Sequence, residues 1–370
     1  MPSLSLLTYN IYAGPPLFTS QAGSLEFGTR LRRQLDDISK LSPDIVCLQE
    51  VLADAVRRQI IHRLGSEYDA CYVRDSSARS TGLRLFVHAL LVSTLSAAMY
   101  AAARIAWHAT ADWGWATAAG VLAWLVVTPC CHATSKTTLC GFIAGDTYPV
   151  GLLILTKKAT LRTVGSPLAR PFRDQDGDWM NLVRPRGVLW QRVVMRADGG
   201  TLWIANTHAD ALSTDMVGKD QAFSVLQPST RRRRQLTELF TQGQQYAAQG
   251  RQQHDAEARS SASSAAGGGS GVLIAGDFNT AYGDGEFSCF EEKGFVDAWR
   301  AVHDTPCYTY DCELNPLARG GHWSKCRETF DYVFMHARSG FKVGEARLVM
   351  NGERPPSDHF GVLVRVDREE

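Results

Sequence analysis

Short apolar runs that end in polar residues recur along most of this 370-residue chain. Each run is largely aliphatic and bounded by glycine or polar groups, which is typical of strands buried on both faces. The clearest runs cover residues 4–10, 45–50, 151–155, 202–208 and 272–277, and helix-like stretches cover 29–41 and 231–246. The pattern predicts a mixed α/β class in which helices cover sheets and polar residues gather where strands end.

Composition limits the classes of function. The chain carries 39 Lys and Arg against 38 Asp and Glu, a formal charge of +1, and 45% of its residues are hydrophobic. A real core is therefore expected, whereas the global basic field that drives non-specific nucleic-acid binding is missing. Nucleic acid is accordingly an unlikely partner, and no specific protein partner is predicted. Because Met1 leads straight into a strand-like run, no secretory signal is predicted.

Two segments depart from the strand-and-helix rhythm. Residues 247–271 end in a Ser, Ala and Gly-rich stretch and predict a flexible loop within the catalytic domain. Residues 85–131 form two apolar halves around a polar connection, which predicts an inserted hydrophobic helical hairpin. The sequence outside this hairpin, residues 1–84 and 132–370, is interpreted as one catalytic domain.

The inserted hairpin is interpreted as a candidate membrane anchor. Three tryptophans lie near its far end, and Arg104 is close enough to that end to snorkel. Basic residues flank only the near end, which places the catalytic domain on the cytoplasmic side. The tryptophans are Trp107, Trp113 and Trp115, and the flanking cations are Arg74, Arg79, Arg84 and Lys136. The alternative is a pair of packed helices in a soluble cytoplasmic protein, which the alanine-rich composition and Arg104 favour.

The polar residues at the expected strand ends are acids, amides and histidines. This set suits a hard divalent cation acting on a phosphate, because Mg²⁺ takes carboxylate oxygens and keeps waters that substrate oxygens replace. Taken singly, each has a structural explanation as a helix cap, a turn residue or a hydrogen-bonded histidine. The candidates are Asn10, Glu50, Asn206, His208, Asp277, Asn279, Asp331, Asp358 and His359.

Six motifs in a fixed order resemble those of the endonuclease/exonuclease/phosphatase superfamily, which includes nucleases, inositol polyphosphate phosphatases, deadenylases and neutral sphingomyelinases. They are Thr8-Tyr9-Asn10, Leu48-Gln49-Glu50, Asn206-Thr207-His208, Gly276-Asp277-Phe278-Asn279, Phe330-Asp331-Tyr332-Val333 and Ser357-Asp358-His359. The resemblance implies a four-layer α/β sandwich, in which two mainly antiparallel sheets pack face to face with helices outside.

The resemblance also implies a role for each residue. Glu50 is expected to be the main Mg²⁺ ligand, with Asn10 beside it and Asp358 on the metal side, and Mn²⁺ or Co²⁺ as possible substitutes. His359 is expected to be the general base on the attacking water, held in its tautomer by Asp331.

Three further residues are expected on the phosphoryl side of the site. Asp277, steered by Asn279, is expected against the attacking water or the phosphoryl group, and within the family the Asp is an alternative proton acceptor to the His. His208 is expected to bind a phosphoryl oxygen or to assist the leaving group.

The segment 308–318 is similar to the Thr-Trp-Asp-Pro-x-x-Asn-x-Ile-Ala segment of bacterial and neutral sphingomyelinases, with Tyr310 in place of Trp and Cys312 in place of Pro. A neutral sphingomyelinase-like phospholipase C acting on a membrane phospholipid is therefore predicted, with the hairpin 85–131 seating the enzyme at the membrane. The chain departs from animal neutral sphingomyelinases in carrying Arg186-Gly187 where they have Lys-Gly.

A nuclease or an inositol-phosphate phosphatase of the same superfamily is the alternative. The run Arg231 to Arg234 would be its phosphate clamp, although one turn of a solvated helix face is the favoured interpretation of that run.

Overall fold

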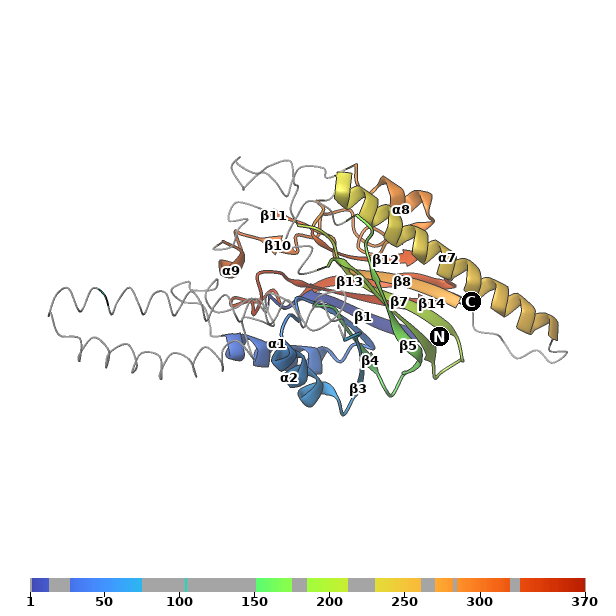
Figure 1. Cartoon of the computed structure of the whole chain (residues 1–370), viewed down its shortest axis with the longest axis horizontal. Coiled ribbons are helices and arrows are strands. Elements are labelled where there is room, and N and C mark those ends of the chain that lie inside the picture. The colour runs from blue at the N-terminus through green and yellow to red at the C-terminus, as the bar shows by residue number, and fades with distance from the viewer. Residues whose placement is uncertain are drawn as a thin grey trace.

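In the computed structural model, two β-sheets pack face to face between two layers of helices (Figure 1). The structure describes residues 2–12, 27–74, 104, 151–174, 185–211, 230–260, 270–281, 285–319 and 327–369. Within these ranges the four-layer α/β sandwich expected from the sequence is confirmed.

The first sheet has six strands in the order β13-β14-β1-β2-β4-β3. Its strands β1 and β2 are parallel, and every other neighbouring pair is antiparallel. The strands are β1 (Ser3–Asn10), β2 (Ile45–Gln49), β3 (Tyr68–Cys71), β4 (Leu153–Lys157), β13 (Phe341–Val349) and β14 (Gly361–Arg368).

The second sheet repeats this plan with six strands in the order β5-β6-β7-β8-β12-β9. Here β7 and β8 form the parallel pair, and the other pairs are antiparallel. The strands are β5 (Leu161–Pro171), β6 (Gly187–Met195), β7 (Thr201–His208), β8 (Ser270–Asp277), β9 (Phe295–Asp297) and β12 (Asp331–His336). A separate two-stranded ribbon joins β10 (Tyr310–Asp311) to β11 (Arg327–Glu328).

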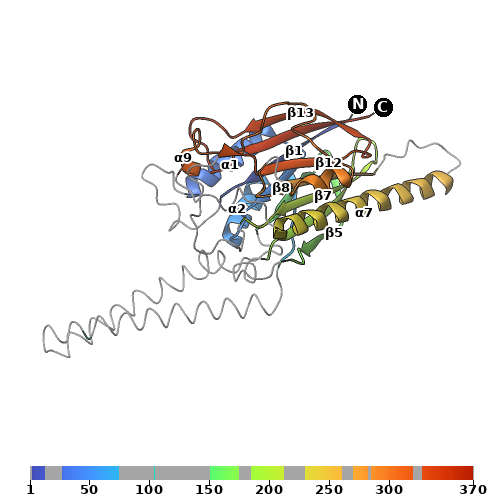
Figure 2. The ribbon, with the colours of Figure 1, turned by 90° about the horizontal axis from the view of Figure 1, so that it is seen from above.

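Helices cover the outer face of each sheet (Figures 1 and 2). Helices α1 (Phe27–Leu41) and α2 (Asp54–Leu64) pack on the first sheet, and α7 (Thr230–Ser260) with α8 (Ser288–Glu292) packs on the second. The short helix α9 (Pro316–Arg319) follows β10. Three apolar clusters result, one between the sheets and one under each helical layer.

Strand β1 shows why the apolar runs are continuous rather than alternating. Leu4 and Leu6 point into the core between the sheets, whereas Leu7 and Tyr9 point into the cluster under α1 and α2. Successive side chains of a strand face opposite sides, so a strand covered on both faces needs apolar residues at every position.

The flexible loop expected over residues 247–271 is wrong for most of its length. Helix α7 continues to Ser260, and β8 begins at Ser270. Residues 247–260 are rich in Ala, Gln, Arg and Glu, whose helix propensities are high, and only Gly250 opposes the continuation. The glycine and serine residues near the end of the segment led to the prediction of a loop over its whole length, including the helical residues before them.

The hairpin expected over 85–131 lies outside the described residues, except for Arg104. Among the described residues, no helix is both long and apolar enough to cross a membrane. The insertion leaves the first sheet after β3 and returns at β4, and these two strands are antiparallel neighbours.

Candidate active site

The predicted site residues converge at one end of the sandwich because of the sheet topology. The parallel pairs β1/β2 and β7/β8 both end there, and the antiparallel strands β12 and β14 both begin there. Residues that end or follow the first four strands and precede or open the last two are therefore brought together across the two sheets. They are Asn10, Glu50, His208, Asp277, Asn279, Asp331, Asp358 and His359.

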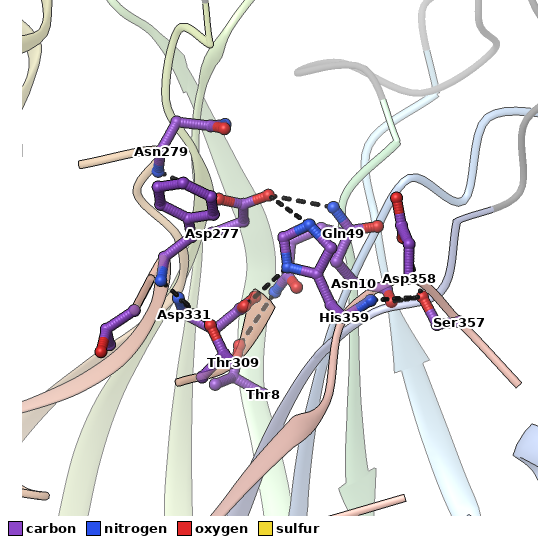
Figure 3. A network of polar contacts seen from close by, with 12 residues as sticks. Thr8, Asn10, Gln49, Asp277, Asn279, Thr309, Asp331, Ser357, Asp358 and His359 are labelled. Carbon is purple, nitrogen blue, oxygen red and sulfur yellow. Dashed lines mark hydrogen bonds and ion pairs between the residues drawn. The ribbon is translucent and has the colours of Figure 1, made fainter. Parts of the chain in front are cut away.

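A histidine between two carboxylates forms the centre of this cluster (Figure 3). Nδ1 of His359 lies 2.7 Å from Oδ2 of Asp331, and its Nε2 lies 3.9 Å from Oδ2 of Asp277. An ionised carboxylate can only accept, so Nδ1 of His359 is the donor and Nε2 is left facing Asp277. All three side chains are buried.

Burial and charge perturb the pKa values of this group. Burial alone would lower the pKa of His359, but the carboxylates of Asp331 and Asp277 raise it well above its ordinary value. Burial raises the pKa of Asp277 to about 7, against the opposing effect of His359. The pKa of Asp277 therefore lies near neutrality, which is typical of proton-transfer groups in active sites.

The carboxylate of Asp277 also contacts three other predicted site residues. Its Oδ2 accepts a hydrogen bond from Nδ2 of Asn10 at 3.0 Å and lies 3.5 Å from Nε2 of His208. Its Oδ1 accepts the backbone N–H of Asn279 at 3.0 Å. The Asp277 carboxylate of the second sheet therefore contacts Asn10 of the first sheet as well as His208 and Asn279.

Glu50 and Asp358 form the candidate metal end of the site. Burial raises the pKa of Asp358 to about 6, and the negative charge of Glu50 contributes to the rise while His359 and Arg30 oppose it. Within the described part of the chain, no donor reaches the Glu50 carboxylate. Two neighbouring carboxylates with an amide nearby form an oxygen-rich donor set that a divalent cation would stabilise, so the residues fit a Mg²⁺ ion.

The group Asp277, Asp331 and His359 offers a second set of donors, with ligand atoms all within 4.8 Å of one another. In it, however, Nδ1 of His359 and Oδ2 of Asp331 are already hydrogen-bonded to each other. A metal ion there would have to break that bond. The geometry therefore suits this group to proton transfer and leaves the Glu50 end as the candidate metal site.

Two residues that sequence reasoning did not select hold the site together. The Oγ1 of Thr309 accepts the backbone N–H groups of Phe330 and Asp331 at 3.0 and 3.1 Å. The hydroxyl of Ser357 donates to the backbone carbonyl of Asn10 at 2.7 Å. Thr309 lies in the segment 308–318 and Ser357 in the Ser-Asp-His motif. Membership of these motifs was the sequence feature that could have identified both residues.

Arg30 of α1 is a third unpredicted residue. Its side chain is 1% exposed and donates to the carbonyl groups of Pro356 and Tyr12 at 3.1 and 3.3 Å. Its charge lowers the pKa of Asp358. Nothing in the local sequence distinguishes Arg30 from the exposed arginines of the same helix, because its partners lie far along the chain.

The segment 308–318, which carried the lipid expectation, is mainly a scaffold. In addition to the role of Thr309, the Tyr310 hydroxyl donates to the Ala318 carbonyl at 3.1 Å. Nδ2 of Asn315 donates to the Ser357 carbonyl at 2.9 Å. These motif residues position the chain around Asp331 and the Ser-Asp-His motif, so their presence does not distinguish between substrates.

Asn206 does not join the site. Its Nδ2 donates to the carbonyl groups of Leu48 and Leu153 at 2.8 and 3.0 Å, and its Oδ1 accepts from Gln49 at 2.8 Å. It therefore links the second sheet to the first beneath the site.

The expectation of a solvated helix face for the run Arg231 to Arg234 is wrong for its first half. Arg231 and Arg232 are buried, and only Arg233 and Arg234 are exposed. Buried acidic partners on neighbouring loops, which are not visible in the local sequence, make this burial tolerable.

Comparison with known proteins agrees with the fold and identifies the family of the chain. The model of the endonuclease/exonuclease/phosphatase family matches residues 7–359. The chain belongs to this family and is a hydrolase of the phosphodiesterase, nuclease or phosphatase type. Enzymes of the family generally use divalent metals. No curated protein matched the chain in sequence.

Several solved structures share the fold at low sequence identity. Danio rerio TDP2 in complex with a single-stranded DNA product is 15% identical, with a TM-score of 0.54 over 99% of this chain and 100% of that one. The catalytic domain of human Nocturnin with a bound sulfate anion is 16% identical, with a TM-score of 0.55 over 99% and 94%. An endonuclease/exonuclease/phosphatase from Bacteroides vulgatus is 15% identical, with a TM-score of 0.56 over 100% of both chains.

Proposed function

We propose that the chain hydrolyses phosphodiester bonds by direct attack of water, with Mg²⁺ as its metal and Mn²⁺ or Co²⁺ as substitutes. The observation that carries the proposal is the imidazole of His359 held between Asp331 and Asp277, next to the carboxylates Glu50 and Asp358. Glu50, Asp358 and Asn10 would hold the metal, which when bound supplies Lewis-acid stabilisation of phosphoryl charge.

The protein side chains divide the remaining work. In its neutral form His359, oriented by its bond to Asp331, takes the proton from the attacking water at Nε2. Asp277 faces the same nitrogen and, with Asn279, orients the water. His208 stands next to Asp277 and donates to a phosphoryl oxygen as negative charge develops. No covalent enzyme intermediate is required.

Two substrate classes are proposed. A choline phospholipid such as sphingomyelin is supported by the resemblance of segment 308–318 and by the apolar sequence of 85–131. Phosphate esters of nucleic acids or inositol form the second class. The breadth of the family supports it, as does the DNA product bound to the TDP2 neighbour. Because segment 308–318 serves as scaffold, its resemblance does not favour the first substrate class over the second.

A substrate panel tests both the reaction and its class. Purified protein is incubated with Mg²⁺ and, separately, sphingomyelin vesicles, lysophospholipid micelles, abasic duplex DNA, single-stranded DNA and an inositol polyphosphate. The His359→Ala variant and a sample treated with EDTA are the controls. Phosphocholine release from lipid alone supports the first class, and cleavage of DNA or inositol phosphate alone overturns it. Inactivity toward every substrate would contradict the proposed phosphodiester hydrolysis.

We further propose that residues 85–131 hold the enzyme at a membrane, with the catalytic domain on the cytoplasmic side. The segment lies within the connection between two antiparallel neighbours, β3 and β4, so its removal still leaves enough chain to join the two strands. A variant that lacks 85–131 should unfold at the same temperature as the intact chain but co-sediment less with liposomes. Equal co-sedimentation of the two proteins would contradict the proposed role of 85–131 as a membrane anchor.

A further inference from the structure

The first two turns of α7 bury polar side chains on the side that faces the second sheet. Arg231 is 9% exposed, and Arg232 and Gln235 are 0% exposed. Removing a guanidinium from water is unfavourable unless it is well paired. The partners of these side chains therefore indicate what the start of the helix does.

Arg231 and Gln235 fasten the chain that leaves β7. Nη1 of Arg231 donates to Oδ2 of Asp210 at 2.7 Å, and the backbone N–H of Asp210 donates to Oε1 of Gln235 at 3.0 Å. Asp210 is 2% exposed and stands two residues after His208. The segment that carries His208 is thus bound to α7 through both a side chain and the backbone.

Arg232 fastens the chain that leaves β8. Its Nε and Nη2 donate to the two carboxylate oxygens of Glu286 at 2.9 and 3.2 Å, and both residues are fully buried. The hydroxyl of Thr280 donates to the same carboxylate at 3.1 Å. Thr280 directly follows Asn279, so this two-pronged ion pair holds the segment that steers Asp277.

The two fastened segments are also bonded to each other. The backbone N–H of Ala209 donates to the Asp277 carbonyl at 2.9 Å, and Nδ2 of Asn279 donates to the Ala209 carbonyl at 3.1 Å. Asn279 has a φ of +50°, a left-handed conformation that residues other than glycine adopt at a cost. The surrounding bonds stabilise this conformation.

We propose that Arg231 and Arg232 are positioning residues for the phosphoryl side of the active site. By fastening the segments after β7 and β8 to one helix, they hold the side chains of His208 and Asn279 in place around Asp277, whose backbone pairs with that of His208 in the sheet. Neither arginine needs to contact substrate, since each is engaged with an acid of the protein. The inference rests on the proposed function, which assigns His208 and Asn279 to the phosphoryl group.

The test compares buried and exposed arginines of one run. With bis(4-nitrophenyl) phosphate and Mg²⁺ as probe, Arg232→Lys should lower kcat about 10- to 100-fold and leave KM within about twofold. An ammonium cannot reproduce the fork to Glu286, and a misplacement of about 1 Å costs about 100-fold. Asp210→Asn, which keeps shape and backbone bond, should lower kcat less. Arg233→Lys and Arg234→Lys, both at exposed positions, are the matched controls and should match wild type.

A second measurement does not depend on turnover. Imidazole ¹H–¹⁵N spectra of the metal-free proteins should show a shifted His208 signal in Arg232→Lys and Asp210→Asn, with the signal of exposed His62 unchanged. His208→Asn identifies the signal. Folded variants with wild-type kcat and wild-type His208 signals overturn the inference, as does a loss confined to KM or shared by the controls. If wild type hydrolyses neither the probe nor any substrate of the panel, the proposed function fails, while the spectra still test the positioning role.

Discussion

At the scale of single residues, the site depends on where charge is buried. Asp331 is 1% exposed and keeps one oxygen for His359, while Thr309 holds its backbone. Because a buried carboxylate is stable only with such partners, the same contacts that orient the imidazole also stabilise the acid. Substitutions at these positions should therefore affect both the chemistry and the stability of the protein.

Asp331→Asn should lower kcat by about 100- to 1,000-fold, which lies within the range expected for a displaced general base. The amide retains the shape of the carboxylate but no longer holds the tautomer that leaves Nε2 of His359 free. Steady-state kinetics on the active substrate measure the effect, and Asp304→Asn, at an exposed position, is the control. A kcat within threefold of wild type would contradict the role of Asp331 as orienter.

Asp297 gives a pH dependence whose sign is defined. Burial raises its pKa from 3.8 to about 6, so the folded chain binds this proton more tightly than the unfolded chain. Its contribution to the free energy of unfolding is therefore largest below pH 4, falls as the pH rises to about 6, and is constant above. The total change is about 3 kcal/mol at most.

Urea unfolding of wild type and Asp297→Asn between pH 4 and pH 7 measures this contribution. The amide oxygen can still accept the Trp299 N–H, which now bonds Oδ1 at 2.9 Å, but the amide cannot ionise. The difference between the two proteins should change by about 2–3 kcal/mol in favour of the variant as pH rises from 4 to 6. Parallel stability curves would show that Asp297 ionises normally.

At the scale of elements, α7 shows how closely a helix approaches its sheet. Gly243 lies where α7 crosses β8 and β9, and a Cβ there would lie 2.7 Å from Cζ of Phe295 and 2.9 Å from Cδ1 of Ile274. The ring of Phe295 is itself packed against Phe240, with centroids 5.2 Å apart. Glycine is therefore tolerated in the helix interior because it permits this contact.

Gly243→Ala should destabilise the fold by about 1–3 kcal/mol, because overpacking outweighs the gain in helix propensity. Gly28→Ala in α1 is the matched control, since a Cβ there meets nothing within 4 Å. That change should be neutral or stabilising by up to about 1 kcal/mol. Chemical denaturation measures both. Equal effects of the two substitutions would contradict the close packing of α7.

At the scale of the whole molecule, polar contacts between the sheets set their relative position. Asn206 on β7 bonds the carbonyl groups of Leu48 and Leu153 and the side chain of Gln49, all from the first sheet. Since Asn10 and Glu50 belong to the first sheet and His208 and Asp277 to the second, the site requires this alignment.

Asn206→Leu keeps the number and branching of the side-chain heavy atoms but removes three buried contacts. The unfolding free energy should fall by about 2–4 kcal/mol, because buried polar groups lose their partners. Urea denaturation followed by tryptophan fluorescence measures the loss, and kcat of the folded fraction should fall as well. Unchanged stability would show that the backbone groups find other partners.

The sequence by itself determined five of the strands (β1, β2, β4, β7 and β8), the order of the six motifs and the family. These depend on local periodicity and on residues that stand together in the chain. Only the tertiary structure decided the roles of Arg30, Arg232 and Asn206, because their partners are distant. The bond from Arg30 to the Pro356 carbonyl spans 326 residues, and that from Asn206 to the Leu48 carbonyl spans 158. Whether an arginine is solvated or buried depends on such partners, and the burial of an acid likewise decides whether it carries a proton at neutral pH.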